Sequence, residues 1–129
     1  MFIIVKKEIM DKLKLALQYL LAIFFILAGA NHFLNADFYL KMMPPYLPWH
    51  PFLVYLSGVF EIILGIMVII PKLTRIAGWG LIALLIAVFP ANLHMALNPD
   101  LFPNISPTSL WVRLPFQAVL IAWAYWYTT

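Results

Sequence analysis

Glu61 is the side chain of this sequence best placed to do chemistry, because it is the one carboxylate inside a long apolar segment. It lies ten residues after Pro51, or about 15 Å along a helix at 1.5 Å per residue, which is close to the middle of a bilayer. An unpaired carboxylate is costly at that depth. Glu61 must therefore be protonated, paired with Arg113 or a histidine, or in contact with water, and it could accept or supply a proton.

Among the polar side chains inside or at the ends of the apolar segments, six more are candidates for the same site: Asn31, His32, Asn92, His94, Arg113 and Gln117. Polar groups in membrane spans face neighbouring helices or a wet cavity, and they mark functional sites by default. The position of each residue along its helix gives its depth in the membrane. These depths predict a polar funnel that is open to the outside and has Glu61 at its inner end. In it the histidines would hydrogen-bond a carbonyl group or relay protons, Arg113 would stabilise an anion, and the three amides would bind the ligand. Alternatively, these groups only fix helix packing through interhelical hydrogen bonds.

His32 and His94 could also serve as axial haem ligands, or form a metal site with Glu61. Neither histidine has a local ligand motif, such as a second histidine four residues away. The chain has no cysteine, which excludes a thiolate nucleophile, an iron–sulfur cluster and c-type haem attachment on its own residues. We therefore expect neither a haem nor a metal.

Four apolar segments must position these side chains, and they predict an all-α, integral membrane four-helix bundle. A helix needs about 20 apolar residues to cross a bilayer, and the segments cover residues 13–34, 51–70, 73–97 and 110–127. Together they form a single transmembrane domain, residues 1–129. Between the first two helices, residues 42–49 are too rich in proline for a helix and too apolar for a solvated loop. The segment 35–50 should therefore lie in the outer interface or fold back onto the bundle.

The spacing of small and polar residues indicates which helix faces touch. Gly58, Glu61 and Gly65 recur at steps of three and four, which places them on one face of the second helix. Small residues allow membrane helices to approach closely, so we predict that this face packs against a neighbouring helix. In the third helix, Pro90 leaves a carbonyl one turn earlier without its N–H partner and should bend the helix.

The composition leaves little room for a soluble domain, since 65% of the 129 residues are hydrophobic and only 10% are charged. Six of the eight lysines and arginines lie before or at the start of the first segment, or between the second segment and the start of the third. The positive-inside rule then puts both termini in the cytoplasm. The basic stretch and apolar run before Ala28-Gly29-Ala30 resemble a signal peptide, but the run is long enough to span and three more follow, so we expect it to be retained. The basic residues form no folded polar face, so no nucleic-acid partner is expected.

Four motifs of the sequence are distinctive: Gly29-Ala30-Asn31-His32-Phe33, Met43-Pro44-Pro45-Tyr46-Leu47-Pro48, Glu61-Ile62-Ile63-Leu64-Gly65 and Phe89-Pro90-Ala91-Asn92. Through them the chain resembles, over roughly residues 20–127, the DoxX family of small four-helix bacterial membrane proteins. The resemblance implies a place in the bacterial cytoplasmic membrane. It also implies a link to redox enzymes, since founding members accompany a thiosulfate:quinone oxidoreductase and others belong to thiol or oxidative-stress complexes. Without cysteine, this chain is not expected to do thiol chemistry itself.

Three functions are compatible with these observations. The leading hypothesis is a DoxX-like membrane subunit that binds a small lipophilic molecule, such as a quinone, as the accessory subunit of a redox enzyme. The second is a non-enzymatic anchor or assembly factor, whose proline-rich link and aromatic ends contact partners. The third is a transporter or receptor for a lipophilic cation, with Glu61 as counter-ion. The expected partners are the lipid bilayer, the ligand, a redox protein and a second copy of the chain.

Overall fold

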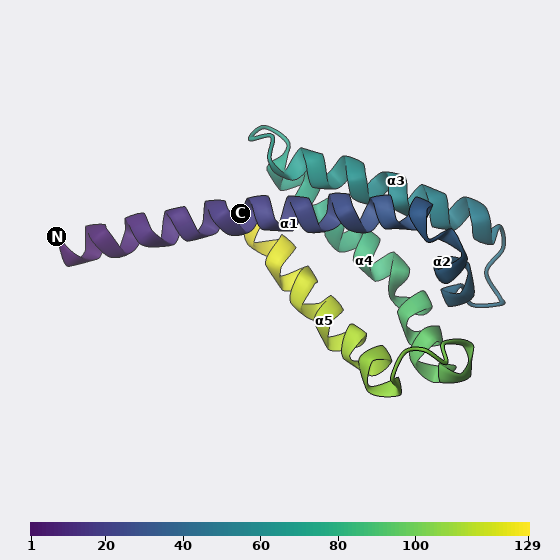
Figure 1. Cartoon of the computed structure of the whole chain (residues 1–129). Helices are drawn as coiled ribbons and strands as arrows, with labels where there is room; N and C mark the ends of the chain where they lie inside the picture. The colour runs from purple at the N-terminus through teal and green to yellow at the C-terminus, as the bar shows by residue number, and fades with distance from the viewer.

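The computed structural model describes residues 1–129, and its secondary structure is entirely helical, which confirms the all-α prediction (Figure 1). The α-helices are, in chain order, α1 (Phe2–Leu34), α2 (Ala36–Met42), α3 (His50–Val68), α4 (Thr74–Leu97) and α5 (Pro107–Tyr125). Two short 3-10 helices, η1 (Pro99–Leu101) and η2 (Trp126–Thr128), follow α4 and α5.

Three of these helices, α1, α3 and α4, are long and apolar enough to cross a membrane. Large apolar side chains lie exposed on their outer surfaces, for example Ile23, Ile63 and Ile86. An exposed apolar surface of this extent is expected where helices face lipid. The chain is therefore a multi-pass membrane protein. The fourth predicted span corresponds to α5, which packs beside α4 but is less apolar because it includes Arg113 and Gln117.

Two features of the helices go beyond the sequence prediction. The helix that contains the first predicted span begins at Phe2, because the lysine-bearing lead-in before residue 13 contains no proline or glycine to interrupt it. Figure 1 shows this lead-in as an arm that extends beyond the other helices. In addition, the segment 35–50 contains the helix α2, which the sequence did not predict. This helix ends at Met42 because Met43 precedes Pro44 and adopts the extended conformation that proline favours in the residue before it.

The helices form two pairs, in which α1 packs along α3 and α4 packs along α5. The first pair is close at a glycine crossing, where a Cβ atom added to Gly29 would lie 2.6 Å from the carbonyl oxygen of Gly58. Further along, a Cβ added to Gly65 would lie 3.0 Å from the carbonyl oxygen of Ala22. The predicted close packing of the Gly58–Gly65 face is therefore confirmed, and its neighbour is α1.

The buried apolar side chains form two separate clusters. The C-terminal cluster has ten residues, including Leu21, Val68, Leu81 and Ala124, and lies near the α3–α4 turn and the end of α5. The α2 cluster has five residues, namely Met42, Met95, Ala96, Phe102 and Leu110. Figure 1 shows α4 and α5 diverging from α1 and α3 toward the end where α2 lies. The two helix pairs are thus joined directly at the C-terminal cluster, and at the other end they are bridged by α2, which contacts α1, α3 and α4.

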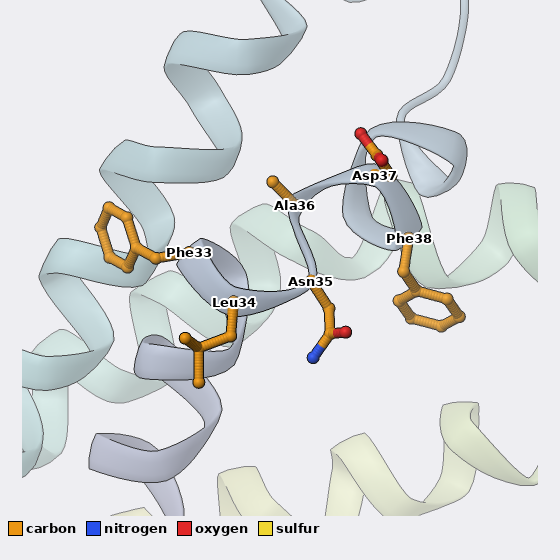
Figure 2. A pocket seen from close by; sticks show the side chains of 6 residues that line it. All are labelled: Phe33, Leu34, Asn35, Ala36, Asp37 and Phe38. Atoms are coloured by element: carbon orange, nitrogen blue, oxygen red, sulfur yellow. The ribbon is translucent and has the colours of Figure 1, made fainter.

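The corner between α1 and α2 is shown in Figure 2. The chain turns at Asn35, and Phe33 points toward α3, where it stacks on Tyr55 with ring centroids 5.4 Å apart. A shallow depression of about 310 Å³ lies at this corner and is lined by the six labelled residues. Its most polar side chains, Asn35 and Asp37, are both exposed. This corner therefore offers no buried polar group that could carry chemistry.

Candidate functional site

A cavity of about 900 Å³ lies between the two helix pairs, with walls from all five α-helices. Most of its lining side chains are hydrophobic. Six of the seven predicted site residues line it: Asn31, His32, Glu61, Asn92, Arg113 and Gln117. The structure therefore gathers polar groups from four helices around one mainly apolar space, although they are distant in sequence.

One wall of the cavity carries a buried pair formed by His32 of α1 and Glu61 of α3. The ring atom Nδ1 of His32 lies 2.9 Å from the carbonyl oxygen of Val54 and must donate to it, because a carbonyl only accepts. The other ring atom, Nε2, lies 3.3 Å from Oε2 of Glu61. A buried carboxylate beside an uncharged ring would be unfavourable, so one proton belongs to the pair, which then carries no net charge. Of the partners predicted for Glu61, the structure selects a histidine.

The pair also leaves an acceptor position free. The contact between Nε2 and Oε2 lacks the geometry of a hydrogen bond, and Oε2 of Glu61 makes no other one. A buried oxygen without a donor is unfavourable unless another group supplies one. Oε2 is thus a buried oxygen whose nearest polar neighbour is Nε2 of His32.

The opposite wall carries a chain of hydrogen bonds that ends at Arg113. Gln117 donates through Nε2 to the carbonyl oxygen of Leu85 at 2.7 Å, which directs its Oε1 toward Nδ2 of Asn92 at 2.6 Å. Asn92 in turn accepts from Nε of Arg113 through Oδ1 at 3.3 Å. The Leu85 carbonyl lies one residue before that of Ile86, which Pro90 leaves without its helical N–H. Gln117 and Asn92 therefore orient the guanidinium.

Residues 21–128 match a protein family described as a domain of unknown function (DUF8561). The chain belongs to this family. The match carries no assignment to the DoxX family. No curated protein and no solved structure shows significant similarity to the chain. The DUF8561 region includes every residue of the cavity wall and leaves out residues 1–20 of the α1 arm.

Within the DUF8561 region, Tyr39 is a site residue that the sequence reasoning missed. Its ring stacks on that of His32 with centroids 4.0 Å apart, and its hydroxyl accepts from Nδ2 of Asn31 at 2.7 Å. Burial raises the pKa of Tyr39, and the hydrogen bond from Asn31 opposes that shift. The hydroxyl keeps its own proton to donate into the cavity. No sequence pattern places α2 over His32, so nothing in the sequence was a reason to include Tyr39.

His94 is the one predicted site residue that the structure places outside the cavity wall. Near the end of α4, its ring atom Nδ1 lies 3.1 Å from Nδ2 of Asn98, and the same amide donates to its carbonyl oxygen at 2.8 Å. These contacts close the C-terminal turn of the helix. In the DUF8561 domain the buried histidine–glutamate pair is therefore His32 with Glu61, and His94 contributes to the helix end. No three histidine, aspartate or glutamate side chains gather closely enough to hold a metal ion.

The cavity is partly covered at the end where the sequence predicts the mouth of a funnel, because Tyr39 and Met42 of α2 line it there. Five of its lining residues are exposed, namely Leu27 and Leu34 on α1, Phe60 on α3, Ala87 on α4 and Phe116 on α5. Exposed apolar side chains therefore border the cavity both at the α1–α2 corner and between the helices, where a membrane protein faces lipid.

Proposed function

We propose that this protein crosses the membrane four times and binds a small lipophilic molecule in the cavity between its helix pairs. The observation that carries the proposal is the convergence of the His32–Glu61 pair and the Arg113 chain on one apolar space. Ligand sites typically occupy about 300–1,000 Å³ and combine apolar walls with a few placed polar groups. This cavity has that volume and that composition, and its exposed apolar rim favours entry from the bilayer.

A quinone is the ligand class that the DoxX-like motifs support. Its carbonyl oxygens could accept hydrogen bonds from Arg113 or Tyr39, and the His32–Glu61 pair could exchange a proton with it. Reduction of a quinone takes two electrons and two protons, and the electrons would come from a redox protein partner. The protein would then be an accessory subunit in a bacterial cytoplasmic membrane, working beside an oxidoreductase.

The charges of the cavity favour this function over transport of a lipophilic cation. A cation site needs an available negative charge, whereas the Glu61 carboxyl forms a neutral pair with His32. Arg113, by contrast, lines the cavity as a cation with no carboxylate partner. A purely structural anchor would need none of these groups to face a cavity. Filling the cavity with a larger side chain separates an anchor from a ligand-binding protein.

The proposed topology can be tested with fusions to a reporter. Six of the eight lysines and arginines lie near the N-terminus or the α3–α4 turn. By the positive-inside rule, we expect this side, with both termini, in the cytoplasm. A cytoplasmically active reporter fused after Thr129 should be active, and the same reporter inserted at Asn104 should be silent. If α5 does not cross the membrane, the C-terminal fusion will instead be silent.

Filling the cavity tests whether a ligand is bound there. Ala28 lines the cavity, whereas Ala118 is exposed on α5 and does not line it. We expect Ala28→Trp to reduce several-fold the small lipophilic molecules that co-purify in detergent, measured by mass spectrometry of the extract. Ala118→Trp should leave them unchanged. Equal amounts in the wild type and both variants would contradict ligand binding and leave an anchor as the function.

A further inference from the structure

The cavity carries one uncompensated positive charge. Its ionisable lining residues are His32, Tyr39, Glu61 and Arg113. The His32–Glu61 pair is neutral because it holds one proton, and the buried phenol of Tyr39 is protonated. No carboxylate lies within 4.0 Å of the Arg113 guanidinium, since the only such contact of a basic group in the structure is that of His32 with Glu61. The net charge facing the cavity is therefore that of Arg113.

The guanidinium of Arg113 is also held in place with most of its donors unused. Its single hydrogen bond uses Nε, and Asn92 accepts it. Both terminal nitrogens lack a protein partner, which leaves free the side of the guanidinium that binds carboxylate or phosphate oxygens in pairs. A partly buried cation without a counter-ion is unfavourable, so a negatively charged partner from outside the chain would stabilise it.

The apolar part of the cavity begins beside this charge. Leu120 lies seven residues after Arg113, about 10 Å further along α5, and it lines the cavity together with Phe24 and Phe25 of α1. Phe116 lies between these levels on α5 and is exposed, so a chain could reach this space from the surrounding lipid. The cavity thus presents a charged position above an apolar one.

We propose that Arg113 binds the oxyanion head group of an amphiphile whose apolar tail occupies the cavity beside Phe25 and Leu120. The inference rests on the proposed function and names the chemistry of its ligand. The oxyanion has two sources, a free long-chain carboxylate or the phosphate of an anionic phospholipid. A neutral quinone would occupy the same cavity without needing the charge.

The experiment compares palmitate with its methyl ester, which has the same tail but no charge, and with a short-tailed quinone. Binding is measured to the full chain in nanodiscs of zwitterionic lipid. We expect palmitate to bind at least about tenfold more tightly than the ester, as hydrogen bonds to a charged group allow. In Arg113→Gln this difference should vanish, in Arg113→Lys part of it should remain, and in the control Arg75→Gln, on the exposed start of α4, it should persist. Thermal stability of each variant is recorded in parallel.

The outcomes separate this inference from the proposed function. If the wild type does not distinguish palmitate from its ester, or Arg113→Gln still does, the oxyanion subsite is wrong. If the quinone binds while palmitate does not, the subsite is wrong and the proposed function stands. If none of the three molecules binds, the proposed function fails as well. The same measurement in nanodiscs that contain anionic phospholipid identifies the source of the oxyanion, because the lipid can then compete with palmitate for Arg113. Loss of palmitate binding assigns the subsite to a lipid phosphate. Continued binding assigns it to a free carboxylate.

Discussion

Replacing Gly29 with alanine is expected to lower the melting temperature of the purified protein strongly. The added Cβ atom would lie 2.6 Å from the carbonyl oxygen of Gly58 and 2.7 Å from Cγ1 of Ile62. The first of these atoms belongs to the backbone of α3 and cannot turn aside, so the two helices must separate. Overpacking of this kind destabilises a core by about 1–3 kcal/mol, and here it acts where the backbones of α1 and α3 come close together.

Gly80→Ala provides the matched control for this prediction. A Cβ added to Gly80 would meet only the side chain of Leu64, nearest at Cδ2 at 2.7 Å, which is the far end of a flexible side chain. Alanine also favours a helix over glycine by about 1 kcal/mol at either position. Gly80→Ala should therefore be nearly neutral or slightly stabilising. Similar melting temperatures for Gly29→Ala and Gly80→Ala would show that the glycine crossing does not limit the packing of α1 on α3.

Removing His32 is expected to destabilise the protein more than neutralising its partner. In His32→Leu the carboxyl of Glu61 stays buried without the ring that faces it, and the stacking on Tyr39 is lost. Removing one member of a buried pair typically costs about 3–5 kcal/mol. Glu61→Gln, by contrast, keeps the size of the side chain and offers an amide N–H to Nε2 of His32. It should therefore fold normally, with a loss below about 1 kcal/mol, yet retain less ligand if Glu61 exchanges a proton with it.

Thermal unfolding and ligand content of the double variants decide between the roles of this pair. His32→Leu with Glu61→Leu should recover part of the stability lost in His32→Leu, because no buried carboxyl remains unpaired. Glu61→Gln with Arg113→Gln should show additive effects, since the structure gives Glu61 no contact with Arg113. A large stability loss in Glu61→Gln that Arg113→Gln rescues, with ligand content unchanged, would make Glu61 a charged packing partner of Arg113.

The helices were largely predictable because long apolar segments and prolines leave strong local signals. The start of α3 beside Pro51 and the start of α4 near residue 73 follow from such signals. The helix α2 was missed because seven residues are too few to show a period, and because the prolines that follow dominate that segment. The sequence also did not predict which helix packs against the Gly58–Gly65 face. A stripe of small residues shows that a helix comes close, but it does not identify α1.

Polar residues inside apolar segments were a useful signal for the site, since His32, Asn31 and Glu61 all line the cavity. The same signal also selected His94, which lies in the last turn of α4, beyond Pro90 and outside the cavity wall. Residue type and depth alone do not show toward which neighbour a side chain at a helix end is directed. The position of Tyr39 depends on tertiary packing, which no local pattern encodes.

The division of the buried apolar side chains into two clusters has a consequence for the rate at which a ligand could leave. The C-terminal cluster holds the helix pairs together with ten buried residues, whereas the α2 cluster has five. Parts of a protein with fewer buried contacts open locally, at a lower free energy than global unfolding requires. Opening of α2 would uncover the cavity while the other cluster keeps the spans associated. The residence time of a bound molecule would then depend on the local stability of the α2 cluster, and changes there could alter the dissociation rate while leaving the melting temperature of the whole domain in place.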